Sequence, residues 1–126
     1  MIVLDTSVLV DALSGPGRSA PALRRAIEQG ERILLPSLVL YEWLRGPRQS
    51  EELAAQEALF PASLALPFGP AEAARAAKLY VSLPRGRGRE IDLAIAASAL
   101  TLGARLWTLN PRDFRDLAGL ELYPAS

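Results

Sequence analysis

Short apolar segments that alternate with helical segments limit the possible folds of this chain more than any other feature. The apolar segments cover residues 2–4, 33–35, 64–66, 105–108 and 120–122, and segments of this length are typical of buried strands. The stretches between them carry helix signals, at residues 6–13, 19–29, 37–44, 49–59, 70–83 and 91–102. Strands that alternate with helices favour a parallel sheet covered on both faces. We therefore expect an α/β fold, and 126 residues are enough for one domain, 1–126.

The composition removes several classes of chemistry. The chain contains no cysteine and no histidine, which excludes disulfides, Ser-His-Asp and Cys-His catalysis, and zinc held by histidine or thiolate. An active site would have to use carboxylates, amides, hydroxyls, lysine or arginine. Carboxylate oxygens are suitable ligands for hard cations such as Mg²⁺ or Mn²⁺.

Charge and hydropathy give two further expectations. The 14 basic and 14 acidic residues balance, so the chain is not a generally basic nucleic-acid binder, although a local basic patch would suffice for binding. No apolar run approaches the roughly 18 residues that a membrane span needs, and the N-terminus reads as a strand. We expect a soluble, cytoplasmic protein with no membrane partner.

Three acidic residues stand in apolar surroundings. Asp5 ends the run 1–4, Glu42 lies within the apolar segment 38–44, and Asp92 opens the segment 91–97. Acids are rarely buried without a partner or a metal, because a buried charge is costly. The three positions therefore predict one region of the fold that must be negative. Asp5 and Asn110 follow predicted strands, at the sheet edge where ligands bind in such folds.

Each of these acids also has a purely structural explanation. Asp5 could be the N-cap of the helix that begins at residue 6, and Glu42 could form a surface ion pair with Arg45 on the next helical turn. Asp92 favours a functional role more strongly. The helical face that it shares is apolar or small, and a helix N-terminus is a favourable place for negative charge; its neighbours on that face are Ile95, Ala96 and Ala99.

Two loops and one helix face are also open to interpretation. The segment Asn110-Pro111 is an ordinary turn former. Alternating arginines in residues 84–89 fit either a solvated loop or a phosphate clamp, since guanidinium groups match phosphate geometry; they are Arg85, Arg87 and Arg89. Asp116 reads as a solvated charge. In the helix at 70–83 we expect Tyr80 and Val81 to face inward.

Four segments together resemble the PIN-domain ribonucleases, and most closely the VapC-type toxins of toxin–antitoxin pairs. They are residues 3–9, Glu42 after an apolar helix start, residues 92–100, and residues 106–114. Each segment alone has low specificity, but here all four occur in the order that the family shows. The similarity covers essentially the whole chain.

The resemblance implies a three-layer α/β/α sandwich with a central parallel sheet. It implies that Asp5, Glu42 and Asp92 converge to hold Mg²⁺ or Mn²⁺, with Asn110 or Asp113 at a fourth polar position. Many family members have an aspartate where this chain has Asn110. Two hydroxyl residues match positions that border the site in similar proteins, and these are Ser7 and Thr108.

The same resemblance implies a metal-dependent endoribonuclease that acts on RNA, with single-stranded RNA as the substrate class. A small antitoxin whose tail blocks the acidic site, and a homodimer, are the implied partners. Two alternatives remain. The first is a non-catalytic PIN-like binding or scaffold module, against which the three acids argue. The second is a receiver-like domain with Asp5 as phosphoacceptor, against which the only lysine, Lys78, argues because it lies inside a predicted helix.

Overall fold

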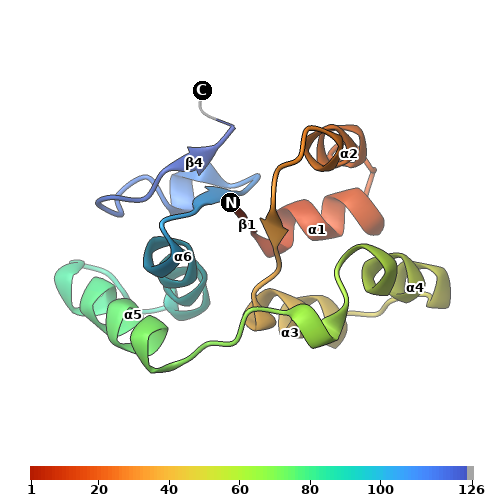
Figure 1. Cartoon of the computed structure of the whole chain (residues 1–126). Coiled ribbons are helices and arrows are strands. Elements are labelled where there is room, and N and C mark those ends of the chain that lie inside the picture. The colour runs from red at the N-terminus through yellow and green to blue at the C-terminus, as the bar shows by residue number, and fades with distance from the viewer. Residues whose placement is uncertain (125–126) are drawn as a thin grey trace.

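A four-stranded parallel sheet forms the centre of the molecule, as Figure 1 shows. The computed structural model describes residues 1–124. Their strand order is β2-β1-β3-β4 and every neighbouring pair is parallel. The first strand is therefore central, and its three residues are fully buried, as expected for a strand covered on both faces. The strands are β1 (Ile2–Leu4), β2 (Ile33–Leu34), β3 (Arg105–Trp107) and β4 (Leu122–Tyr123).

Helices cover both faces of this sheet, which confirms the expected α/β/α layering. In Figure 1, α1 and α2 lie on one side of the sheet, and α6 lies on the other side with α5 outside it. Helix α3 contacts both α1 and α6. The α-helices within residues 1–124 are α1 (Thr6–Leu13), α2 (Ala20–Glu28), α3 (Ser37–Arg45), α4 (Ser50–Leu59), α5 (Pro70–Ser82) and α6 (Glu90–Leu102). None of them combines the length and the apolar character that a membrane-crossing helix needs.

Helix α6 is the buried helix of the fold. Its residues 93–99 are all buried, and four of these seven are alanines, whose small side chains permit close packing between α5 and the sheet. The helix ends at Gly103, which adopts the left-handed conformation with φ 65° that glycine tolerates best. Asp92 lies in the first turn of α6, directly before the buried residues 93–99.

Two details of the predicted elements were wrong. Residues 64–66 do not form a strand of the sheet, because Leu66 makes only an isolated bridge with Pro36. Pro36 has no N–H to donate, and Pro67 follows directly, so the pairing cannot be extended as a regular ladder. The residues before Leu66 form a short 3₁₀ turn, η1 (Ala62–Leu64). The last strand begins at Leu122 rather than Leu120.

The expected inward face of α5 was also wrong. Val81 is 82% exposed and Tyr80 is 40% exposed, whereas Leu79 and Leu83 pack against the core. A helix turns by about 100° per residue, so an error of one or two positions moves a side chain to the opposite side. The contact face of α5 is therefore the one that contains Leu79 and continues to Leu83, the residue after the helix.

Truncation of a buried α6 side chain should destabilise the whole domain. Ile95 is fully buried, so we expect Ile95→Ala to lower the free energy of unfolding by about 2 to 5 kcal/mol, through reduced burial and a residual cavity. Urea denaturation followed by circular dichroism measures this. The matched control is Val81→Ala on exposed α5, for which we expect a change within about 0.5 kcal/mol. Equal effects would contradict the assignment of α6 as the buried helix.

Candidate functional site

The candidate site lies at the carboxyl ends of β1 and β3, where the polar residues that follow the two strands are in contact. Asp5 directly follows β1, and its backbone N–H donates to the carbonyl of Trp107 at 2.9 Å. Its side chain is buried, with a residue exposure of 5%. Asp5 occupies the N-cap position of α1 but its side chain makes no capping hydrogen bond. The capping explanation for this carboxylate therefore does not hold.

Two hydroxyl groups hold the Asp5 carboxylate instead. Thr108 Oγ1 donates to Asp5 Oδ2 at 2.7 Å, and Ser7 Oγ donates to the same oxygen at 2.8 Å. Each hydroxyl also accepts a backbone N–H at 3.0 Å, from Asn110 and Leu109 respectively. Within residues 1–124, no hydrogen bond reaches the other carboxylate oxygen, Oδ1. The protein thus orients Asp5 through one oxygen and leaves the second available to a ligand.

Glu42 is held by a residue next to Asp5. Thr6 Oγ1 donates to Glu42 Oε1 at 2.5 Å, which joins the start of α1 to α3. The ion pair with Arg45 is present but long, at 3.5 Å from Arg45 Nη2 to Glu42 Oε2. Sequence reasoning missed Thr6, although two consecutive hydroxyl residues after a strand-ending aspartate were a visible signal. Consecutive hydroxyls, Thr6 and Ser7, therefore fix two different acids.

Asp92, in the first turn of α6, is the acid most affected by its surroundings. Burial, followed by repulsion from the carboxylates of Asp5, Asp113 and Glu42, raises the pKa of Asp92 to about 6, and the nearby Arg89 opposes this rise. Repulsion of this kind falls off with distance, so the side chains that act on Asp92 must lie near it. The expectation of a single negative region is thus supported by the electrostatics of Asp92.

The fourth polar position lies in the turn η2 (Pro111–Asp113). Both Asn110 and Asp113 are exposed, and the backbone N–H of Asp113 donates to the Asn110 carbonyl at 3.0 Å. Among the charges that raise the pKa of Asp92, Asp113 comes second after Asp5 and ahead of Glu42. Asp113 is therefore the member of this pair that adds charge to the acidic region.

Arg89 joins the two segments that carry Asp92 and Asp113. Its guanidinium makes a bidentate pair with Asp116, with both N–O distances at 2.8 Å, and donates to the Asp113 carbonyl at 2.8 Å. The hydrogen bond to Asp116 raises the pKa of Arg89 and lowers the pKa of Asp116. Asp116 is therefore more than a solvated charge, although no sequence pattern links residues 27 positions apart. Arg85 and Arg87 lie in the same loop, before α6.

The oxygen atoms of the acidic side chains are suitable ligands for a hard divalent cation, although these side chains do not surround a single position. Within residues 1–124, no three acidic side chains are grouped as ligands of a single ion. The available donors are all oxygens, and Asp92 experiences repulsion from three other carboxylates. A bound divalent cation would offset that repulsion and favour closer approach of the acids. The residues that could hold it are Asp5, Asp92 and Glu42, with Asp113 beside them.

Three comparisons with known proteins show what the chain is similar to. The sequence model of the PIN domain matches residues 2–120. Ribonuclease VapC19 of Mycobacterium tuberculosis is 39% identical over 117 residues, which cover 90% of this chain and 92% of that protein. The toxin–antitoxin complex VapBC-5 of M. tuberculosis contains a chain with 26% identity, a TM-score of 0.63, and coverage of 94% and 91%. DNA-bound VapBC from Salmonella typhimurium contains a chain of the same fold, with 22% identity, a TM-score of 0.77, and coverage of 96% and 95%.

The raised pKa of Asp92 predicts a specific dependence of stability on pH. A carboxyl whose pKa is 3.8 when unfolded and about 6 when folded holds its proton more tightly in the folded state. The folded protein therefore loses stability as the pH rises from about 4 to about 6. We expect Asp92→Asn, which removes the charge, to be more stable than wild type at high pH by roughly 1 kcal/mol after solvent screening.

The measurement is urea denaturation of wild type and Asp92→Asn, with divalent ions chelated, at pH values on both sides of this window. The stability difference should nearly vanish when Asp92 is protonated in the wild type. Glu28→Gln, which neutralises an exposed acid on α2, is the control and should show no such trend. A difference that does not change with pH would show that Asp92 is not in a repulsive environment.

Proposed function

Because this chain belongs to the PIN domain family, we propose that it is a metal-dependent endoribonuclease that hydrolyses RNA phosphodiester bonds. The observation that carries the proposal is the raised pKa of Asp92, whose negative charge is repelled by three other carboxylates and only partly offset by Arg89. A group of repelling carboxylates at the carboxyl edge of a parallel sheet is typical of a site that binds a cation. The name of the 39% identical relative, a ribonuclease, supports RNA as the substrate.

The residues would divide the work as follows. Asp5 presents one fixed oxygen, because Ser7 and Thr108 hold the other, and Asp92 approaches it from α6. Mg²⁺ or Mn²⁺ bound there would lower the pKa of a coordinated water and neutralise charge on the phosphate. Glu42, which accepts a hydrogen bond from Thr6, would accept a proton from the attacking water or hold that water in line. Asp113, tethered through Arg89, completes the polar rim.

Substrate access favours single-stranded RNA. Two residues at the border of the acidic site, Asn110 and Asp113, are exposed. A phosphate can therefore approach this border from solvent. A single strand can present its phosphates at such a rim without prior unwinding. Hydrolysis needs no histidine in this scheme, which is consistent with the composition of the chain.

We further propose that the chain is the toxin of a VapBC-type pair and is controlled by a small antitoxin. Similarity to chains found in VapBC complexes supports this assignment. An acidic catalytic rim is a natural docking point for a basic tail, because an arginine or lysine can occupy the place of the cation. A homodimer and a cytoplasmic location remain part of the same proposal.

Neutralising either aspartate should remove most of the ribonuclease activity. For Asp5→Asn and Asp92→Asn we expect single-turnover cleavage of a labelled single-stranded RNA to slow by about 100-fold or more, as for loss of one main electrostatic stabiliser. Thr108→Val, which removes one hydrogen-bond donor from the Asp5 carboxylate and the acceptor of the Asn110 backbone N–H, should slow cleavage by about 10-fold to 100-fold. Glu51→Gln on α4 neutralises an exposed acid and should leave the rate unchanged. Wild-type rates in Asp5→Ala would refute the proposed function.

Metal binding separates the enzyme from a non-catalytic PIN-like module. We expect titration calorimetry with Mn²⁺ to show binding to wild type and roughly tenfold or more weaker binding to Asp92→Asn, because a ligand oxygen and its charge are removed. Chelation by EDTA should abolish RNA cleavage, and added Mg²⁺ or Mn²⁺ should restore it. Identical Mn²⁺ titrations of the two proteins would favour the scaffold alternative.

A further inference from the structure

We propose that a groove beside the acidic site is a nucleotide subsite, which binds one phosphate of the RNA with two arginines and the adjoining base with an aromatic wall. This inference rests on the proposed function, since it identifies where the RNA continues after the cleavage site. We define the α2 groove as the space between α2 and the ends of β3 and β4. Its volume is about 620 Å³, which lies within the usual range for ligand sites.

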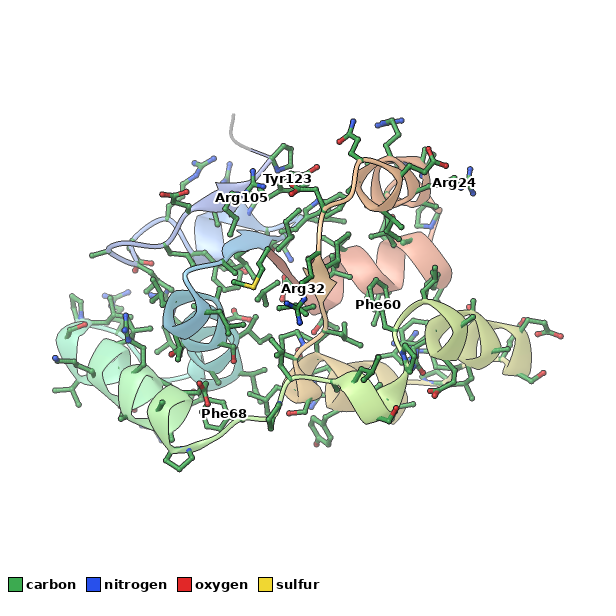
Figure 2. The ribbon with its side chains drawn as sticks, viewed as in Figure 1. Arg24, Arg32, Phe60, Phe68, Arg105 and Tyr123 are labelled. Atoms are coloured by element: carbon green, nitrogen blue, oxygen red, sulfur yellow. The ribbon has the colours of Figure 1, made fainter. Side chains whose placement is uncertain are left out.

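The α2 groove lies at the ligand-binding edge of the sheet. Trp107 ends β3, and Tyr123 ends β4. Both are therefore at the carboxyl ends of parallel strands, the edge at which Asp5 also lies. In Figure 2, Tyr123 lies beside β4 on the side of the molecule where α2 is also found. The opposite wall comes from α2 and the residues around it, namely Arg18, Ser19, Ala22, Arg25 and Gln29.

The chain itself connects the groove to the acidic site. Side chains on an extended segment alternate in direction. Thr108 directs its hydroxyl to Asp5, whereas its two neighbours, Trp107 and Leu109, line the groove. On α1, Ser7 contacts Asp5 and Asp11 lines the groove. Those two positions are one helical turn apart, or about 6 Å along the axis. The groove therefore lies across the segment 107–109 from Asp5, within reach of an RNA strand bound there.

The charged groups of the groove suit a phosphate. Arg18 and Arg25 are exposed, and within residues 1–124 neither takes part in an ion pair. Among the described residues of the lining, Asp11 is the only acidic side chain, and its Oδ2 accepts the backbone N–H of Ser19 at 2.7 Å. The lining thus carries two positive charges and one negative charge. Arginine side chains bind phosphate oxygens through pairs of parallel hydrogen bonds.

The remaining lining suits a nucleobase. Trp107 is only 5% exposed and forms the floor, in an edge contact with Tyr123 at 5.0 Å between ring centroids. Tyr123 is partly exposed, with the Arg105 guanidinium over its ring at 4.8 Å, and Leu109 is 46% exposed. The exposed parts of both side chains offer surface to a ligand. Bases stack on aromatic surfaces with little sequence preference. Gln29, at the end of α2, adds an amide that can bond to a base edge.

A subsite of this kind meets a requirement that the acidic rim cannot meet. The carboxylates repel the phosphates on either side of the scissile bond, and the chain has no net positive charge to draw RNA to it. Of the loop arginines, Arg89 is already bound to Asp116, whereas Arg85 and Arg87 take part in no ion pair within residues 1–124. The α2 groove contains two arginines, and Leu109, which follows Thr108 in the chain, also lines it. These arginines could therefore bind the RNA next to the acidic site.

The test compares two double variants with the same change in charge. Arg18→Gln with Arg25→Gln alters the groove. Arg24→Gln with Arg32→Gln alters two arginines that do not line it; both are labelled in Figure 2. Fluorescence anisotropy of a labelled single-stranded RNA, in EDTA to prevent cleavage, gives the affinity at several salt concentrations. Thermal melting confirms that all variants are folded.

We expect the groove variant to bind RNA roughly tenfold or more weakly, and its salt dependence to fall by about 0.7 in slope for each phosphate that it no longer neutralises. The control variant should match wild type within about twofold. Tyr123→Leu should weaken binding without changing the salt slope, because stacking releases no counterions. In single-turnover cleavage, the groove variant should need more protein to reach half-maximal rate but keep the maximal rate.

The outcomes separate this inference from the proposed function. Wild-type protein that binds RNA through the groove but cleaves none would refute the nuclease and support the subsite. Cleavage by wild type together with unchanged affinity and salt slope in the groove variant would overturn the subsite. In that case the arginines of the α2 groove would bind another anion, such as an acidic peptide, and the proposed nuclease function would be unaffected.

Discussion

The paired hydrogen bonds from Ser7 and Thr108 to one oxygen of Asp5 are the interaction on which the site depends. They connect the end of β1, the first turn of α1 and the end of β3, at 2.8 Å and 2.7 Å. A buried carboxylate without such donors would be costly. Each hydroxyl donates to Asp5 and also accepts a backbone N–H. The carboxylate is therefore oriented before any ligand arrives, which reduces the free-energy cost of assembling the site.

Asp92 is placed at the expense of stability. Asp92 enters a region that already contains Asp5, Glu42 and Asp113, and its raised pKa records the resulting repulsion. The fold limits this repulsion with one cation, Arg89, whose pair with Asp116 also fixes the turn that carries Asp113. Destabilising charge that is tolerated and partly offset in this way is typical of functional sites.

The layers of the fold could be predicted from the sequence, because they depend on local patterns, and the same patterns made Asp5 and Asp92 candidates for the site. A fully apolar β1 and a small-residue α6 can only be buried, and Asp5 and Asp92 adjoin them. What could not be predicted depends on contacts between distant residues. Arg89 and Asp116 meet only because the segment after η2 folds against the start of α6. The prediction of which face of α5 is buried was wrong, because alanines occur on several faces of this helix and form no clear apolar stripe.

The distribution of arginines explains how a chain with no net charge could bind RNA. Several arginines are used by the fold: Arg48 stacks on Trp43 at 4.1 Å, Arg105 pairs with Glu31 at 2.7 Å, and Arg89 pairs with Asp116. These side chains have given up much of their capacity to bind phosphate. Arg18 and Arg25 make no ion pair within the described part of the chain, and they line the groove next to the acids. For an RNA strand, the position of uncommitted charge matters more than the total, because salt screens charges that lie more than about 10 Å apart.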